Sequence, residues 1–286
     1  MTVDLQRITN FFAANPQGMA NRVDLPYRLA SWSLEDPANV RLWERDGALQ
    51  AVAVLQMPWF ALDFTYAPGA EQVLPEILAW GTERMTAIAQ ERADELPLAL
   101  YLTPERAVHI TLVEAHGFQH DADWDIVHLA RGLNEPISPV TLPDGFTFRP
   151  MNGQVEAYVE LHQTAFGSKN MRESWRARTL TMPEYRPELD LFIVDSADQP
   201  VAFCIGWLLG DEGQIEPLGV HPDYQRLGLG RAVLLEGLRR LQVAGATRAY
   251  IHSYKQNDPA LALYQRPDNG DFRPQHDVTA YVRNCR

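Results

Sequence analysis

Cysteine, positive charge and long apolar runs are all scarce in this sequence, and each scarcity excludes a class of protein. Only two of the 286 residues are cysteines, Cys204 and Cys285, so neither a disulfide framework nor a cysteine metal site is expected. Lys and Arg number 25 against 37 Asp and Glu, and the net charge of −12 does not favour nucleic acid or an anionic membrane surface. No apolar run approaches the roughly 18 residues of a membrane-spanning helix. The first residues lack a secretory pattern, so we expect a cytoplasmic protein.

The length and composition favour two globular domains. The content of 46% hydrophobic and 22% charged residues is that of an ordinary folded chain. A length of 286 residues suits two domains of roughly 100–150 residues each. Residues 136–145 contain Pro136, Pro139 and Pro143 without periodicity and are expected to be a linker. The predicted domains are therefore residues 1–135 and 146–286.

The same order of elements is expected in each half, which predicts an α/β (α+β) fold repeated in tandem. The order is hairpin, third strand, break, long helix, strand, short helix and strand. Strands are predicted at Val40–Glu44, Leu49–Gln56, Trp59–Thr65, Leu96–Leu102, Asp123–Arg131, Phe146–Arg149, Leu189–Asp195, Pro200–Leu209, Gln214–Val220, Arg248–His252 and Val278–Val282. Helices are predicted at Gln72–Gln90, Pro104–Ala115, Gln154–Ala165, Arg172–Leu180, Leu229–Val243 and Asp258–Gln265. An unrelated α/β domain is the alternative for the first half.

The segment from Val220 to Arg231 has the features of a phosphate-binding loop. It lies between a predicted strand and a predicted helix, and Gly228 and Gly230 leave the backbone open to close approach. The first N–H groups of the helix and its dipole favour an anion, and Arg226 and Arg231 add full charges. The alternative is a tight turn without a ligand. The P-loop pattern is absent, and Val233 replaces the third glycine of a dinucleotide-binding fingerprint.

This loop resembles the defining motif of the GNAT superfamily, Q/R-x-x-G-x-G/A, with Gln225, Gly228 and Gly230 at its fixed positions. The resemblance extends from about Phe146 to Val282. It implies a mixed, twisted sheet with splayed central strands, and acetyl-CoA (acyl-CoA) as co-substrate with no metal. It also implies that the backbone of Leu218, Gly219 and Val220 pairs with the pantetheine arm. The pyrophosphate is then held by Gln225, Arg226, Leu227, Gly228, Leu229, Gly230 and Arg231.

A second family pattern, N-x-x-A-x-x-x-Y, matches residues 257–264. The resemblance implies that Asn257 hydrogen-bonds the cofactor arm and that Tyr264 approaches the CoA sulfur as a general acid. The offset of seven residues brings both to one face of a helix. An aromatic side chain packed in the core is the alternative for Tyr264.

Glu216 is the candidate general base, because it precedes the loop on the same predicted strand. An acceptor amine with a pKa of about 10.4 is almost wholly protonated at neutral pH and needs such a base. An ordinary strand carboxylate is an equally weighted alternative, and Asp211 and Glu212 are weaker candidates. The family implies that the backbone N–H of Val220 stabilises the oxyanion.

The predicted function is transfer of an acetyl group from acetyl-CoA to a primary amine of a small molecule or peptide. A non-catalytic acyl-CoA-binding protein is the alternative, and a monomer or homodimer is expected. The first half resembles a second GNAT unit, but its loop Tyr66–Glu71 lacks the glycine pattern, so no CoA is expected there. His109, His116 and His120 form no metal-ligand pattern. His252 either lines the substrate site or is structural.

Overall fold

The computed structural model describes residues 4–134, 137–151 and 153–286. The chain forms two compact units, and neither is continuous in sequence. Unit 1 contains Met1–Arg22, Ser31–Ile126 and His276–Arg286, and unit 2 contains Val23–Ala30 and Val127–Gln275. The expected end of the first domain, at residue 135, and the start of the linker, at residue 136, lie outside the described residues. The division at 1–135 and 146–286 stays a prediction, and the compact units depart from it by exchanging segments.

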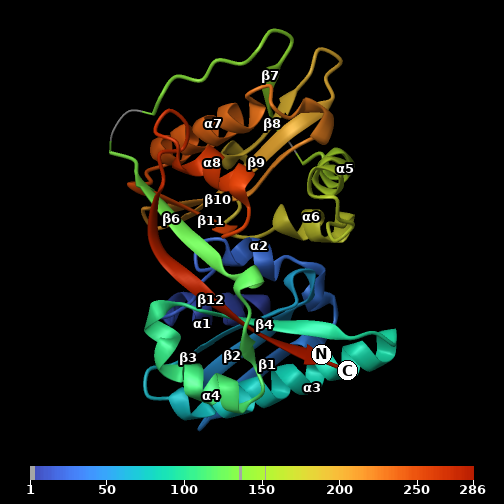
Figure 1. Cartoon of the computed structure of the whole chain (residues 1–286), viewed down its shortest axis with the longest axis vertical. Helices are drawn as coiled ribbons and strands as arrows, with labels where there is room; N and C mark the ends of the chain where they lie inside the picture. Colours follow the sequence, from blue (N-terminus) through green and yellow to red (C-terminus); the bar gives the residue numbers. More distant parts are fainter. Residues whose placement is uncertain (1–3, 135–136, 152) are drawn as a thin grey trace. The chain divides into compact units, whose positions relative to one another are not determined.

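The described chain contains eight α-helices and twelve strands, and Figure 1 labels most of them. The helices are α1 (Leu5–Ala14), α2 (Leu25–Leu29), α3 (Leu74–Arg92), α4 (Ile110–Ala115), α5 (Val155–Phe166), α6 (Glu173–Thr179), α7 (Leu229–Val243) and α8 (Asp258–Gln265). The strands are β1 (Val40–Arg45), β2 (Ala48–Gln56), β3 (Ala61–Tyr66), β4 (Leu96–Leu102), β5 (Gln119–His120), β6 (Ile126–Gly132), β7 (Thr147–Pro150), β8 (Asp190–Val194), β9 (Pro200–Leu209), β10 (Glu212–Val220), β11 (Arg248–Tyr254) and β12 (Arg273–Cys285).

In unit 1 the strands follow the order β1-β2-β3-β4-β12. The first hairpin turns at Asp46 and Gly47, which both have positive φ (53° and 76°), as a two-residue turn with right-handed twist requires. β3 and β4 are parallel, with one registered pair at Ala61 and Ala99. Helix α3 contributes buried apolar residues to the core of this unit, among them Ile77, Leu78 and Met85.

In unit 2 the strands follow the order β7-β8-β9-β10-β11-β6. Helix α7 covers the sheet and has a buried face that includes Val233, Leu234, Leu238 and Leu241. Gly237 permits this close packing. A Cβ atom there would lie 2.9 Å from both Cys204 Sγ and Ile215 Cδ1.

The last strand of each half belongs to the unit of the other half. β6 follows α4 of unit 1 in sequence, yet residues 127–132 belong to unit 2. β12 follows α8 of unit 2, yet its residues from His276 onward belong to unit 1, where Thr279–Cys285 pair antiparallel with β4. The two halves are thus connected by strands that begin in one unit and end in the other.

The predicted mixed sheet with splayed central strands is confirmed. In the described part of the chain, β10 and β11 are parallel and pair along Glu212–Gln214 alone, whereas β10 pairs with β9 along most of its length. The register with β9 shifts between Ile215 and Leu218, so Glu216 and Pro217 form an irregularity in β10. The periodicity of the sequence did not predict α1 or α2.

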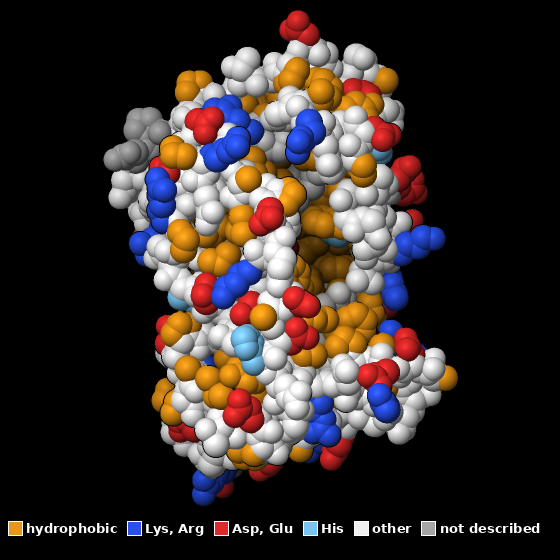
Figure 2. Space-filling view, in the orientation of Figure 1, with side chains coloured by type: hydrophobic (Ala, Val, Ile, Leu, Met, Phe, Trp, Pro, Cys, Tyr) orange, Lys and Arg blue, Asp and Glu red, His pale blue; other side chains and the backbone are white. Residues whose placement is uncertain are grey.

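The described helices and the surface charge bear on where the chain can bind. No helix in the described part of the chain is long and apolar enough to cross a membrane. On the face seen in Figure 2, Lys and Arg side chains are interspersed with Asp and Glu.

Replacing Gly237 with valine should destabilise unit 2 by about 1–3 kcal/mol, because the new side chain must displace Cys204 or Ile215 from the packed core. Urea unfolding followed by circular dichroism measures the change. Gly132→Ala is the matched control, since a Cβ at Gly132 meets no atom within 4 Å, and it should change stability by about 0.5 kcal/mol or less. Equal stability of Gly237→Val and the control would contradict the packing argument.

Candidate active site

The loop before α7 presents an uncapped helix N-terminus. Gly228 is the N-cap residue, has φ 83°, and makes no side-chain capping bond to the first turn. Its position is open, since a Cβ there would meet nothing within 4 Å. Gln225, Arg226 and Leu227 are exposed. The free N–H groups, the open backbone and the nearby charge fit a bound phosphate group, and the predicted role of this loop stays a prediction.

Arg231 connects the start of α7 to the loop that follows α8. Its Nε donates a hydrogen bond of 2.9 Å to the carbonyl oxygen of Asp268. Gly230, the second residue of α7, packs close to α8 and to β10, because an added Cβ there would lie 3.5 Å from both Leu263 and Val220. The loop and α8 are therefore held together at the position where the motif places the cofactor.

The opening between β10 and β11 lies directly before this loop. The backbone of residues 218–220 pairs with β9 on one edge of β10. On the other edge, the described pairing of β10 with β11 stops at Gln214. Gly219 packs closely on its neighbours, because an added Cβ would lie 2.5 Å from the Phe203 ring. The backbone edge toward β11 is the one that the family resemblance assigns to the pantetheine arm, and that assignment stays a prediction.

Glu216 lies at the irregularity of β10 and beside a histidine. The backbone oxygen of Glu216 accepts a hydrogen bond of 2.7 Å from Trp207 Nε1, which fixes the strand at this point. Its carboxylate Oε2 is 3.9 Å from His252 Nε2. His252 also contacts Gln214 at 3.2 Å through Nδ1 and stacks on His128 with ring centroids 5.6 Å apart. His252 is therefore a neighbour of Glu216, and its place in the substrate site stays a prediction.

The surroundings of Glu216 favour its neutral form. Burial raises its pKa to about 8, and the charge of Asp24 adds to this effect, while Arg28 opposes it. Burial also lowers the pKa of His252, so the neighbouring imidazole is mainly neutral at physiological pH. Strongly shifted groups of this kind are concentrated at functional sites.

Helix α8 carries the two residues of the second motif. Asn257 is the N-cap of this helix, and its Oδ1 accepts a hydrogen bond of 3.3 Å from the Ala260 N–H. Tyr264 is 8% exposed and contacts the ring of Phe272 edge-on. Burial raises the pKa of Tyr264 well above its usual value, and the charge of Glu216 acts in the same direction. Both predicted roles stay predictions, and a protonated Tyr264 is compatible with its role.

Two weaker candidates for the base have structural partners. Asp211 accepts a hydrogen bond from the Thr247 hydroxyl, 2.7 Å away, in the turn before β10. Glu212 accepts one from Tyr250 at 2.9 Å. Among residues 4–134, 137–151 and 153–286, no group of three His, Cys, Asp or Glu side chains is arranged to hold a metal ion.

Sequence reasoning missed Asp24 and Arg28, although both charges act on Glu216. They lie on the segment 23–30, which joins unit 2 from far away in sequence. The string Asp24-Leu25-Pro26 is a helix start signal, with an acidic residue before proline in the first turn. That signal predicts a helix but not its partner.

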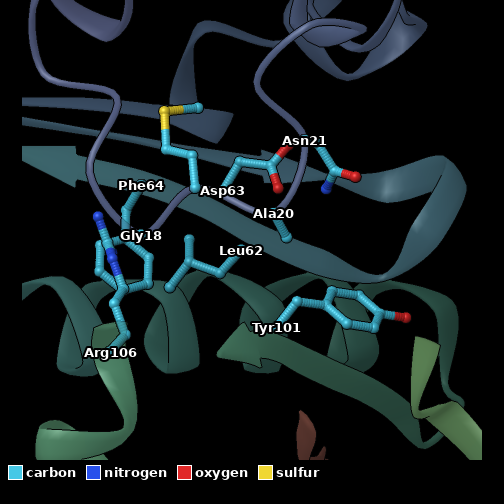
Figure 3. Close-up of a pocket in the computed structure, with 9 residues that line it drawn as sticks. Gly18, Ala20, Asn21, Leu62, Asp63, Phe64, Tyr101 and Arg106 are labelled. Carbon is cyan, nitrogen blue, oxygen red and sulfur yellow. The ribbon is translucent and has the colours of Figure 1, made fainter. Parts of the chain in front are cut away.

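In unit 1 the corresponding gap is occupied by the chain itself. Among the residues that the structure describes, β3 and β4 share no registered pair beyond Ala61 and Ala99. The hollow beside them is lined by Leu62, Phe64 and Tyr101. The segment 18–21 forms its other wall, as Figure 3 shows. Thr65 Oγ1 donates a hydrogen bond to the carbonyl oxygen of Asn15, and Arg106 Nη2 donates one of 3.0 Å to that of Gln17. The remaining hollow of about 20 Å³ has room for about one water molecule.

Comparisons with known proteins agree with this geometry. Residues 155–267 match the model of the acetyltransferase (GNAT) family. Relatives named mycothiol acetyltransferase include that of Geodermatophilus obscurus, 27% identical over 66% of this chain and 65% of the relative. That of Acidothermus cellulolyticus is 26% identical over 81% and 76%, and that of Salinispora tropica is 32% identical over 48% and 49%. The chain thus spans from about half to about three quarters of the length of these relatives.

Solved structures show the same fold. A GCN5-related N-acetyltransferase from Sphaerobacter thermophilus superposes with a TM-score of 0.63 at 21% identity, covering 86% of this chain and 81% of that one. A tandem GNAT protein from the clavulanic acid biosynthesis pathway also gives 0.63, at 13% identity, covering 98% and 94%. The segment that matches the GNAT family, residues 155–267, lies in unit 2 and contains both the opened sheet and the glycine-containing helix start.

Acetyl-CoA should stabilise the wild-type protein, and Gly228→Val should abolish the effect. At a ligand concentration about 100 times Kd the added stability is roughly 2.7 kcal/mol, which corresponds to a Tm increase of about 5–10 °C. Valine is strained at φ 83° and fills the space before the helix. Differential scanning fluorimetry with and without acetyl-CoA measures the shift.

Gly245→Val is the matched control for that variant. Gly245 follows the other end of α7, has φ 101°, and likewise meets no atom within 4 Å at an added Cβ. The control should lose stability from backbone strain but keep the full acetyl-CoA shift. A full shift in Gly228→Val would place the cofactor elsewhere.

Unit 1 should provide no second CoA site. The segment that lines its gap and the absence of the glycine pattern in residues 66–71 both oppose binding. Isothermal titration calorimetry of the intact chain should therefore give one CoA per chain. Two equivalents would show that unit 1 accepts the ligand.

Proposed function

We propose that the chain is an N-acetyltransferase in which unit 2 transfers an acetyl group from acetyl-CoA to a primary amine. The observation that carries this proposal is the position of Glu216, with a pKa of about 8, at the irregularity of β10 beside the opened sheet. Members of the GNAT family generally use acetyl-CoA. The names of the relatives favour a small-molecule acceptor related to mycothiol over a peptide.

The residues of unit 2 that would bind the cofactor are those of the loop and the opened strand. The N–H groups at the start of α7, with Arg226 and Arg231, would hold the pyrophosphate, and Leu218–Val220 and Asn257 would hold the arm. Bound acetyl-CoA supplies the activated acetyl thioester. The backbone N–H of Val220 would donate a hydrogen bond to the oxygen that becomes negative.

Glu216 would accept the proton of the acceptor amine, directly or through water. An ordinary glutamate is about 6 pKa units below an alkyl ammonium, so proton transfer to it is strongly unfavourable. With its pKa raised to about 8, Glu216 reduces that difference by on the order of 3 units, or about 4 kcal/mol. The raised pKa also leaves Glu216 mostly protonated, and so unable to accept a proton, at pH 7. Activity should therefore rise with pH.

Tyr264 would donate a proton to the departing thiolate. Its raised pKa keeps the hydroxyl protonated throughout the working pH range. A thiolate with a pKa near 8.5 needs little assistance, so the contribution of this donor depends on the rate-limiting step. A Tyr264→Phe variant should lower kcat with a chemistry-limited acceptor while leaving acetyl-CoA affinity within a few-fold.

The test of the function is release of CoA over a panel of amines. The panel contains aminoglycosides, polyamines, amino acids, peptides with free N-termini and small amines related to mycothiol. A non-catalytic acyl-CoA-binding protein would show an acetyl-CoA-dependent Tm increase but no CoA release above background with any of them. That result would contradict the proposal.

Glu216→Gln should reduce kcat/KM by about 10²–10⁴-fold at neutral pH, the usual contribution of a general base. The wild-type rate should rise with pH around a midpoint near 8, because Glu216 must lose its proton before it can act. The loss in the variant should shrink as the pH approaches the pKa of the acceptor amine. A loss of constant size at every pH would instead assign Glu216 a structural role.

A further inference from the structure

We propose that the segment 23–30 is part of the catalytic site of unit 2, where Asp24 and Arg28 act as positioning residues for Glu216. This inference rests on the proposed function, in which Glu216 is the base. The segment comes from near the start of the chain, whereas the family model begins at residue 155. The proposal thus extends the site beyond the part of the chain that carries the family motif.

Two backbone carbonyl groups attach the segment to α6. Trp175 Nε1 donates a hydrogen bond of 3.0 Å to the carbonyl oxygen of Tyr27, and Arg178 Nε donates one of 2.8 Å to that of Ala30. Figure 1 shows α2 beside α6, in agreement with these bonds. Because both acceptors are main-chain atoms, α2 is held in a fixed position.

An aromatic contact then leads from α2 to Glu216. The Tyr27 ring lies 5.0 Å from Trp175 and 6.1 Å from Trp207, measured between centroids. Trp207 in turn donates the 2.7 Å hydrogen bond to the backbone oxygen of Glu216. Trp207 thus contacts both the added segment and the candidate base.

The two charged side chains that the segment 23–30 contributes are buried at this place. Asp24 is 1% exposed and Arg28 4%, although burying such groups is costly. Both act electrostatically on Glu216 and on His252, with opposite signs. Two acids, one arginine and one histidine therefore form a single cluster, and the segment 23–30 supplies half of it.

Other titratable groups near Glu216 come from the remaining elements around it. They are Tyr27 on α2, His252 on β11, Tyr264 on α8 and Tyr158 on α5. The tyrosines have pKa values raised by burial, and that of His252 is lowered, so none of them becomes charged between pH 7 and 9. Asp24 and Arg28 are the groups of this cluster whose charges can set the ionisation of Glu216.

The opposite charges of Asp24 and Arg28 predict opposite effects on Glu216. Asp24 raises the pKa of Glu216, so Asp24→Asn should move the rise of kcat/KM to lower pH. Arg28 lowers that pKa, so Arg28→Met should move the rise to higher pH. Each shift should be on the order of one pH unit, as for a neighbouring charge in a protected site.

Three controls separate this effect from damage to the fold. Asp24→Glu and Arg28→Lys keep the charges and should restore the wild-type midpoint. Glu188→Gln removes an exposed carboxylate of unit 2, changes the net charge as Asp24→Asn does, and should leave the midpoint unchanged. Each variant must also keep the acetyl-CoA-dependent Tm increase, which reports a folded unit 2.

Unfolding provides a second readout that needs no acceptor amine. The raised pKa of Glu216 contributes stability at low pH, and that contribution is lost as pH rises toward 8. The Tm difference between wild type and Glu216→Gln should therefore change with pH and level off near 8. When Glu216→Gln is compared with its parent in a protein that carries Asp24→Asn, the Tm difference should level off at lower pH. In a protein that carries Arg28→Met, it should level off at higher pH.

The failures of the two proposals are distinguishable. If Glu216→Gln keeps wild-type kcat/KM at neutral pH, the proposed base is wrong. If Glu216→Gln loses activity but Asp24→Asn and Arg28→Met move neither the kinetic nor the unfolding midpoint, or move both in one direction, the role of the segment 23–30 is overturned. Opposite shifts with rescue by the charge-conserving variants support it.

Discussion

The separation of β10 from β11 after Gln214 is the constraint on which the site depends. Parallel neighbours normally share hydrogen bonds along their length, and ending them early leaves backbone groups that need other partners. β9 satisfies one edge of β10, and the irregularity at Glu216 and Pro217 reorients the strand where the separation begins. The same local break leaves an edge for a ligand and places a carboxylate beside it. The start of α7 then supplies N–H groups at the end of that strand.

Close packing behind the sheet keeps this opening from collapsing. Helix α7 approaches the strands at Gly237, next to Cys204 and Ile215, so its first turn is fixed relative to β10. A buried ion pair between α6 and β8 also helps to fix the arrangement of unit 2. Arg176 and Asp190, both fully buried, form an ion pair of 2.5 Å, and Tyr185 donates a hydrogen bond to the same carboxylate. Rigid support of this kind lets a carboxylate keep a shifted pKa.

The sequence predicted the local elements well and their partners poorly. The helices Leu229–Val243 and Asp258–Gln265 and the strand Leu96–Leu102 have the predicted bounds, because each has strong periodicity and clear end signals. The loop at Gly228 was recognisable because fixed spacing is a local property. Asp24, Arg28 and Trp207 were not, because their importance comes from long-range contacts that no periodicity records. The helix α2 was missed for a related reason: it is five residues long and is held by Trp175 and Arg178.

The exchange of end segments has a consequence for synthesis of the chain on the ribosome. Residues 23–30 emerge early, but Trp175, Arg178 and Trp207, which hold them, are made much later. Unit 1 waits still longer, because the strand beside β4, β12, is translated after every other strand described here. Until then β4 has an unpaired edge, a feature that invites pairing with other chains. A chain that stops before residue 276 therefore leaves unit 1 with an open sheet edge, so premature termination exposes an aggregation-prone surface even when every residue of unit 2 is present.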